Sequence, residues 1–148
     1  MVWGGKTEHD RTPFVVAGNM TGIRCRDDIV QLYVIPFIKA QANNVTLQQD
    51  NSRPHVARVV HDYLTQQNVD VLPWQADSSD LSPIEHVWNE MERRLHHLQN
   101  QPVTLPEIGL ALIRIWNNIP QAFCNPLIRS IRRRCQACIN ANGGHTGY

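Results

Sequence analysis

The stretch that decides the fold spans residues 45–88 and reads VTLQQDNSRPHVARVVHDYLTQQNVDVLPWQADSSDLSPIEHVW. Residues 45–47 and 69–72 are rich in β-branched and aliphatic side chains, which predicts two short strands. Between the strands, apolar residues recur with the spacing of one helix face, at Val56, Val59, Val60, Tyr63 and Leu64. A helix that joins two strands in this way makes them parallel neighbours in a sheet.

The residues before this stretch predict a hairpin and a helix. Val2-Trp3 and residues 14–16 are β-prone, and the polar residues between them are typical of a hairpin connection. From Ile23 onward the apolar spacing becomes helical, with Pro36 as a kink or stop.

The residues after this stretch predict helices only. Ser82-Pro83 is a typical helix start, and further helices are expected over residues 105–117 and 126–142, the last one stopped by Gly143-Gly144. The order of elements therefore predicts an α/β fold, with a mixed sheet flanked by helices and a helical C-terminal tail.

Composition excludes several classes of protein. The chain has 148 residues, of which 42% are hydrophobic and 18% charged, as in a globular domain. The densest apolar window, Ile108 to Trp116, is too short for a membrane span and contains Arg114. Four cysteines are too few for a disulfide scaffold, and a single CxxC at Cys135 and Cys138 indicates reduced thiols on a helix.

Two acidic residues stand at positions where an α/β sheet binds ligands. Asp50 follows the first predicted parallel strand, and Glu85 lies just beyond the second, with thirty-four residues between them. Two carboxylates that meet there suit a hard divalent cation. The residues alone leave another interpretation open, in which Asp50 accepts backbone N–H bonds and Glu85 forms a capping box with Ser82.

Two blocks carry a family resemblance. The strings LQQDNSRPHVARVV, at residues 47–60, and LPWQADSSDLSPIEHVW, at 72–88, resemble the characteristic blocks of Tc/mariner-type transposases. The similarity extends to VWGG at 2–5, RTPFVVAGNMTG at 11–22 and RSIRRRCQACINANGGHTGY at 129–148, and so covers nearly the whole chain.

The resemblance implies a ribonuclease H-like catalytic domain in which an Asp, Asp, Glu (DDE) triad holds Mg²⁺ or Mn²⁺. Asp50 matches the second Asp of that triad and Glu85 matches the Glu. The family's first Asp lies on a strand that precedes the VWGG segment. We therefore expect residues 1–148 to be a single catalytic domain that lacks its first strand, its first Asp and the helix-turn-helix domains of the family.

The activity that the resemblance implies is DNA transposition and integration in the nucleus. The family cleaves DNA strands at transposon ends and joins them to target DNA, so DNA and other transposase chains are the expected partners. Because only two carboxylates of the triad match, we expect this chain to be inactive by itself. The alternative is a catalytically inactive, transposon-derived remnant that binds DNA or other transposase chains.

The basic residues of the tail suggest where DNA would bind. No acidic residue follows Glu107, and the tail is locally basic although the net charge of the chain is only +1. Phosphate contacts supply most of the non-specific affinity for DNA. The expected DNA-binding residues are Arg53, near Asp50, and four arginines of the tail: Arg129, Arg132, Arg133 and Arg134. The first three of these tail arginines are expected to share one helix face.

Overall fold

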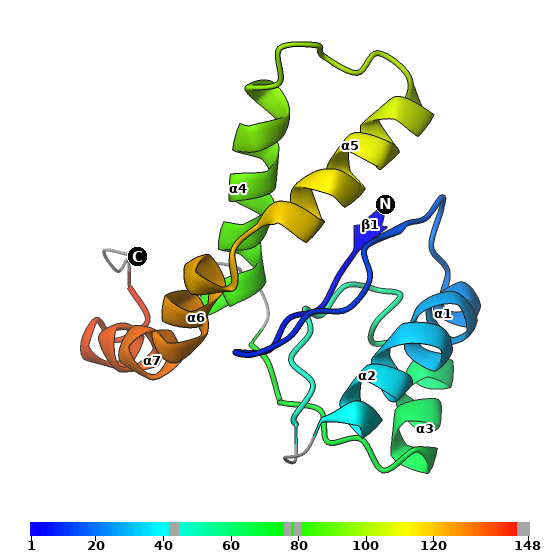
Figure 1. Ribbon diagram of the computed structural model, residues 1–148. Helices are drawn as coiled ribbons and strands as arrows, with labels where there is room; N and C mark the ends of the chain where they lie inside the picture. Colours follow the sequence, from blue (N-terminus) through cyan, green and yellow to red (C-terminus); the bar gives the residue numbers. More distant parts are fainter. Residues whose placement is uncertain (42–44, 76–77, 79–80, 145–148) are drawn as a thin grey trace. The chain divides into compact units, whose positions relative to one another are not determined.

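The computed structural model describes residues 1–41, 45–75, 78 and 81–144. These residues form two compact units (Figure 1). The first unit comprises Met1–Gly5 and Val15–Ser78, and the second comprises Lys6–Phe14 and Ser79–Tyr148. The connection of the expected hairpin therefore belongs to a different unit from its strands.

The hairpin is confirmed. Strand β1 (Val2–Trp3) pairs antiparallel with β2 (Val15–Val16), with Val2 opposite Val16. The N-terminal ammonium group extends this pairing by donating to the carbonyl of Ala17 at 2.9 Å.

The two strands expected at 45–47 and 69–72 are shorter than predicted. A single parallel bridge joins Leu47 to Val71. The Leu72 N–H donates to the Leu47 carbonyl at 2.8 Å. The parallel direction agrees with the predicted helical crossover, but among the described residues the mixed sheet is reduced to this bridge and the hairpin.

One continuous helical segment follows the hairpin, made of α1 (Gly22–Arg24), η1 (Cys25–Val34) and α2 (Ile35–Ala40). Its middle is a π-helix, in which Ile35 donates to the carbonyl of Val30. Pro36 does not stop the segment, because it occupies the first turn of α2, where a missing N–H costs little.

Helix α3 (Arg58–Gln66) begins later than its apolar pattern suggested. Residues 53–56 form turns instead, and Val56 is 54% exposed rather than part of the buried face. Val60 and Leu64 are buried against the helical segment 22–40, as expected. Gly22 is required at this contact, because an added Cβ atom would lie 2.5 Å from Cβ of Ala57.

The second unit begins with a pair of helices, α4 (Pro83–His96) and α5 (Leu105–Asn118), which lie side by side (Figure 1). A capping box starts α5, in which Thr104 accepts from the N–H of Glu107 and the Glu107 side chain accepts from the N–H of Thr104. Both helices begin within one residue of the positions predicted from the sequence.

The prediction of a single helix over residues 126–142 is wrong. The structure has α6 (Gln121–Arg129) and α7 (Ile131–Asn140), separated at Ser130. Pro126 lies inside α6, where the packing of its apolar neighbours into the core offsets the missing hydrogen bond. The chain leaves α7 through Asn142 and Gly143, both with positive φ, so the predicted glycine stop is present.

The core of the second unit surrounds Trp116, which is completely buried. Its ring stacks on Trp88 at a centroid distance of 5.6 Å, and its Nε1 donates to the Thr12 carbonyl at 3.0 Å. The segment Lys6–Phe14 is held there by Arg11, whose Nη2 donates to the Ile119 carbonyl at 2.7 Å. Arg11 thereby satisfies a carbonyl just beyond the end of α5.

Candidate functional site

Asp50 lies three residues beyond the parallel bridge and is held by a short turn. Its Oδ1 accepts from the Ser52 N–H at 3.2 Å and lies 2.5 Å from Nδ1 of His55. Partial burial favours a higher pKa for Asp50, but hydrogen bonds from Ser52 and the charge of His55 bring the pKa below its ordinary value. The carboxyl group is therefore ionised at neutral pH, as a metal ligand must be.

The position of Asp50 leaves room for a ligand. Its side chain is 60% exposed. More than half of the side chain is therefore accessible to a ligand. The expectation that Asp50 accepts a backbone N–H is also correct, since the Ser52 N–H donates to Oδ1.

Two neighbours of Asp50 hold its segment in place, and a third, Arg53, carries a positive charge. The His55 ring is mostly buried and also contacts Ser52 Oγ at 3.0 Å. Asn51 donates to the Trp74 carbonyl at 2.9 Å, which ties the segment after Leu47 to the segment after Val71. Arg53 is exposed, as a residue that contacts a phosphate must be.

Glu85 lies in the first turn of α4, where the partial positive charge of the helix N-terminus favours an ionised carboxylate. The Ser82 side chain makes no hydrogen bond to the first turn of α4 within the described residues, so the capping-box interpretation is not supported there. Asp50 belongs to the first unit and Glu85 to the second, so the approach of the two carboxylates stays a prediction.

His86, next to Glu85, is held by Arg134 of α7. Nη1 of Arg134 lies 2.8 Å from Nε2 of His86, and because a guanidinium only donates, the accepting Nε2 carries no proton. Burial, and then the charge of Arg134, lower the pKa of His86. Arg134 itself is only 3% exposed, which corrects the expectation that it contacts DNA: so little surface cannot reach a phosphate.

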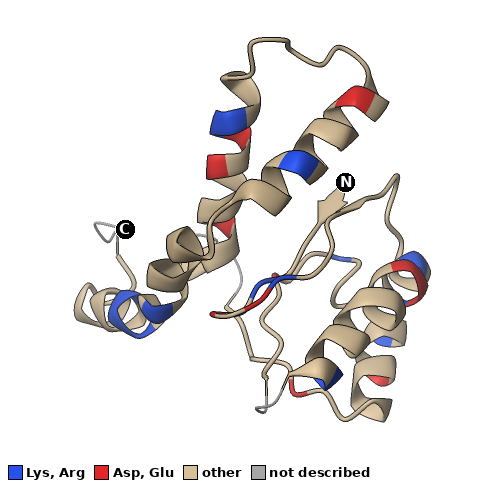
Figure 2. Ribbon diagram, viewed as in Figure 1, with Lys and Arg blue, Asp and Glu red and all other residues tan. Residues whose placement is uncertain are grey.

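The other tail arginines do not share one helix face, because Ser130 separates α6 from α7. Arg129 ends α6, and its Nε donates to Glu8 at 2.6 Å. Arg132 and Arg133 are exposed at the start of α7. Figure 2 shows these basic residues gathered where α6 meets α7. The basic surface predicted from the sequence is present, but it is smaller than expected.

The chemistry of the donors suits an oxygen-ligated cation. The described residues contain no group of three or more His, Cys, Asp or Glu side chains arranged to hold a metal. Cys135 and Cys138 are free thiols on α7, as predicted. Asp50 and Glu85 each carry carboxylate oxygens, the type of ligand that Mg²⁺ prefers.

A cluster that the sequence analysis missed lies on α4. Glu90 accepts from Arg93 Nε at 2.8 Å and from Arg94 Nε at 2.7 Å. These hydrogen bonds lower the pKa of Glu90 to about 2. The signal was present in the sequence, since residues at i, i+3 and i+4 are neighbours on a helix surface.

Replacing Glu90 with Gln should change how stability depends on pH. The pKa of folded Glu90, about 2, lies below its ordinary value of 4.5, so the stabilisation is complete above pH 4.5 and is lost as the pH falls toward 2. We expect Glu90→Gln to cost about 2 kcal/mol at pH 6 and much less at pH 2. Urea unfolding across this pH range measures the difference.

The control for this experiment is Glu92→Gln, since Glu92 is on the same helix and its side chain is 71% exposed. We expect this variant to follow the wild-type curve. An equal cost of Glu90→Gln at pH 6 and pH 2 would contradict the assigned ion pair.

Comparison with known proteins shows that this chain is similar to transposases over its whole length. No family model matches it. It is 32% identical to the transposase of transposable element Tc1 from Caenorhabditis elegans over 151 residues, which cover all of this chain and 54% of that protein. The Tc3 transposase of the same organism is 25% identical, again over the whole chain. The chain spans about half the length of the curated relatives it matches.

Solved structures show the fold. The catalytic domain of Mos1 transposase with raltegravir and Mg matches 98% of this chain and 76% of its own, with a TM-score of 0.84 and 19% identity. A Mos1 paired-end complex with the left transposon end matches 97% of this chain and 44% of its own, with a TM-score of 0.82 and 19% identity. The chain therefore shares its fold with the catalytic domain of Mos1 transposase. It is homologous over its full length to the Tc1/mariner transposases.

Among the helices of the described residues, none is long enough and apolar enough to cross a membrane.

Proposed function

We propose that this chain provides part of the catalytic centre of a transposase that cleaves DNA strands at transposon ends and joins them to target DNA. The observation that carries the proposal is the full-length similarity to Tc1 transposase, together with an ionised, exposed Asp50 at the position expected for a catalytic carboxylate. DNA transposition takes place on genomic DNA, so the nucleus is the proposed location.

Asp50 and Glu85 are the proposed ligands of a divalent cation, Mg²⁺ or Mn²⁺. Such a cation activates an attacking hydroxyl and stabilises the leaving oxygen of a phosphodiester. The Asp50–His55 contact orients the carboxylate, and Glu85 lies in the first turn of α4, next to the positive end of the helix dipole. The family pattern has three carboxylates, so the complete centre needs one in addition to Asp50 and Glu85.

The proposed partners are DNA and other transposase chains. The Mos1 paired-end complex, which this chain resembles in fold, supports both. On this chain, we propose that the DNA backbone is contacted by Arg53 and by the exposed arginines at the start of α7, Arg132 and Arg133. Arg129 has a smaller role in this proposal, because binding a phosphate competes with its contact to Glu8.

Replacing Arg132 and Arg133 together with Ala should weaken DNA binding without regard to sequence. Each phosphate contact that is lost lowers the slope of log affinity against log salt by roughly 0.9. We expect the magnitude of this slope to fall by up to about 1.8 in the double variant and by less in Arg129→Ala. Fluorescence anisotropy with duplex DNA at several salt concentrations measures both.

The matched control is Arg58→Ala, which removes the same charge from α3, where the side chain is 94% exposed. We expect it to leave the slope unchanged. Equal slopes for wild type and the Arg132, Arg133 double variant would show that these arginines are only solvated surface charges.

A chimera tests the catalytic proposal. In the Tc1 transposase, the segment that aligns with this chain is replaced by residues 1–148, so that the Tc1 protein supplies the remainder of its own length. We expect metal-dependent cleavage at Tc1 ends, lost on Asp50→Ala or Glu85→Ala. An inactive chimera that folds and binds DNA would instead favour the transposon-derived remnant.

A further inference from the structure

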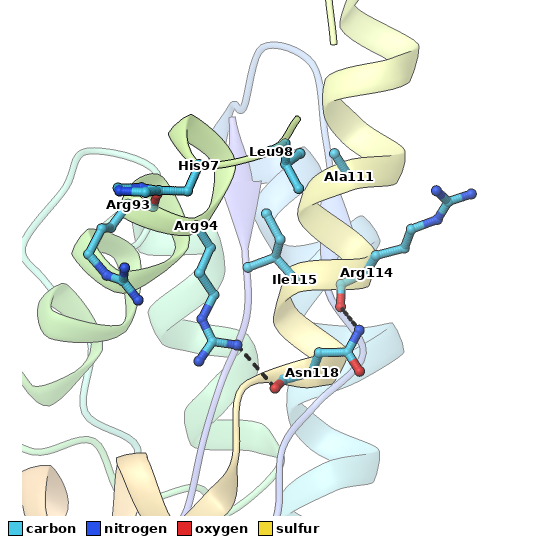
Figure 3. A pocket seen from close by; sticks show the side chains of 8 residues that line it. All are labelled: Arg93, Arg94, His97, Leu98, Ala111, Arg114, Ile115 and Asn118. Atoms are coloured by element: carbon cyan, nitrogen blue, oxygen red, sulfur yellow. Dashed lines mark hydrogen bonds between the residues drawn. The ribbon is translucent and has the colours of Figure 1, made fainter. Parts of the chain in front are cut away.

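A groove of about 490 Å³ lies between α4 and α5 of the second unit (Figure 3). The residues that line it come from both helices and from the turn after α4: Arg93, Arg94, His97, Leu98, Ala111, Arg114, Ile115 and Asn118. The proposed catalytic function assigns no role to this groove.

The groove has an apolar floor and a cationic rim. Leu98, Ala111 and Ile115 form the floor, and the arginine side chains flank it, with Arg93 and Arg94 on the α4 side and Arg114 on the α5 side (Figure 3). The apolar surface continues along α5 through Leu110, which is 57% exposed. Ile115 is only 7% exposed, so the accessible apolar surface comes from Leu98, Ala111 and Leu110.

The rim carries more positive than negative charge. Glu90 is the partner of both Arg93 and Arg94, so one carboxylate is shared by two guanidinium groups. Arg114 is exposed, and the hydrogen bonds recorded for it among the described residues involve its backbone carbonyl and leave the guanidinium available. The groove is therefore complementary to a negatively charged partner.

We propose that this groove binds an acidic amphipathic helix of a partner protein. A helix lays its apolar face into such a groove through residues at i, i+3 or i+4 and i+7, and its flanking carboxylates meet the arginines. Duplex DNA fits less well, because a phosphate backbone has nothing to place on the apolar floor. The inference is independent of the catalytic proposal.

The probe is a fluorescent synthetic helix of roughly 16 residues, long enough to be helical in water. It carries leucines at i, i+4 and i+7 with glutamates beside them, and it is titrated with the full 148-residue chain by anisotropy. Two companion helices replace either the glutamates with lysines or the leucines with serines. We expect saturable one-to-one binding of the first helix and at least roughly tenfold weaker binding of both companions.

Variants locate the binding site. Arg114→Glu reverses an exposed charge without disturbing the core and should weaken the acidic helix roughly tenfold. Glu90→Gln releases Arg93 and Arg94 and should strengthen binding. Arg132→Glu, the same charge change on α7, should have no effect. Circular dichroism checks that each variant is folded.

Three results would overturn the proposal. The first is the absence of saturable binding, and the second is equal affinity of the acidic helix for wild type and Arg114→Glu. The third is displacement of the helix by a short DNA duplex whose own binding falls equally in Arg114→Glu, since the groove would then be a DNA surface.

Discussion

Replacing Asp50 with Asn is expected to abolish metal-dependent strand cleavage by the chimera with Tc1 transposase. The amide keeps the volume of the side chain and one oxygen for the Ser52 N–H, but it removes the negative charge that holds the cation. A metal contributes several kcal/mol to transition-state stabilisation, and about 1.4 kcal/mol is a tenfold change in rate. We therefore expect a loss on the order of a thousandfold or more.

Metal binding can also be measured directly, without relying on cleavage. Titration of Mn²⁺ into the 148-residue chain, followed by electron paramagnetic resonance, should show weaker binding in Asp50→Asn and Glu85→Gln. The control is Asp70→Asn, since Asp70 is exposed beside the same parallel bridge. Cleavage by Asp50→Asn at the wild-type rate would show that Asp50 is not a ligand.

Replacing Trp116 with Ala should nearly unfold the second unit. The side chain is fully buried, stacks against Trp88, contacts the tilted ring of Phe14, and donates to the Thr12 carbonyl. Truncating a buried tryptophan costs about 3–5 kcal/mol, a large part of the roughly 5–15 kcal/mol that stabilises a domain. Urea unfolding followed by near-ultraviolet circular dichroism measures the loss.

Trp116→Phe separates packing from the hydrogen bond. It keeps an aromatic ring but leaves the Thr12 carbonyl without its donor, so we expect an intermediate cost of about 1–3 kcal/mol. Trp3→Ala, in the partly buried hairpin of the first unit, should cost less than Trp116→Ala. A cost below about 1 kcal/mol for Trp116→Ala would contradict its place at the centre of the core.

Sequence patterns within one segment correctly predicted the elements that are stabilised by interactions within that segment. Helix α5 begins at Leu105 because Thr104 and Glu107 form a capping box, and the interactions of that box lie within four residues of one another. The hairpin and the buried positions Val60 and Leu64 follow from side-chain spacing. The ionisable residue at 50 was found in the same way, through its place after a strand and the block that surrounds it.

The sequence by itself therefore determined the class of fold, the family resemblance and the identity of Asp50 as a candidate ligand. Tertiary packing decided where α3 begins, how the last helix divides at Ser130 and which arginines are exposed. The basic run around Arg134 predicts an exposed charge, yet Arg134 is buried against His86, forty-eight residues away in sequence. Such contacts depend on which segments meet in space, and periodicity within one segment carries no information about its partner.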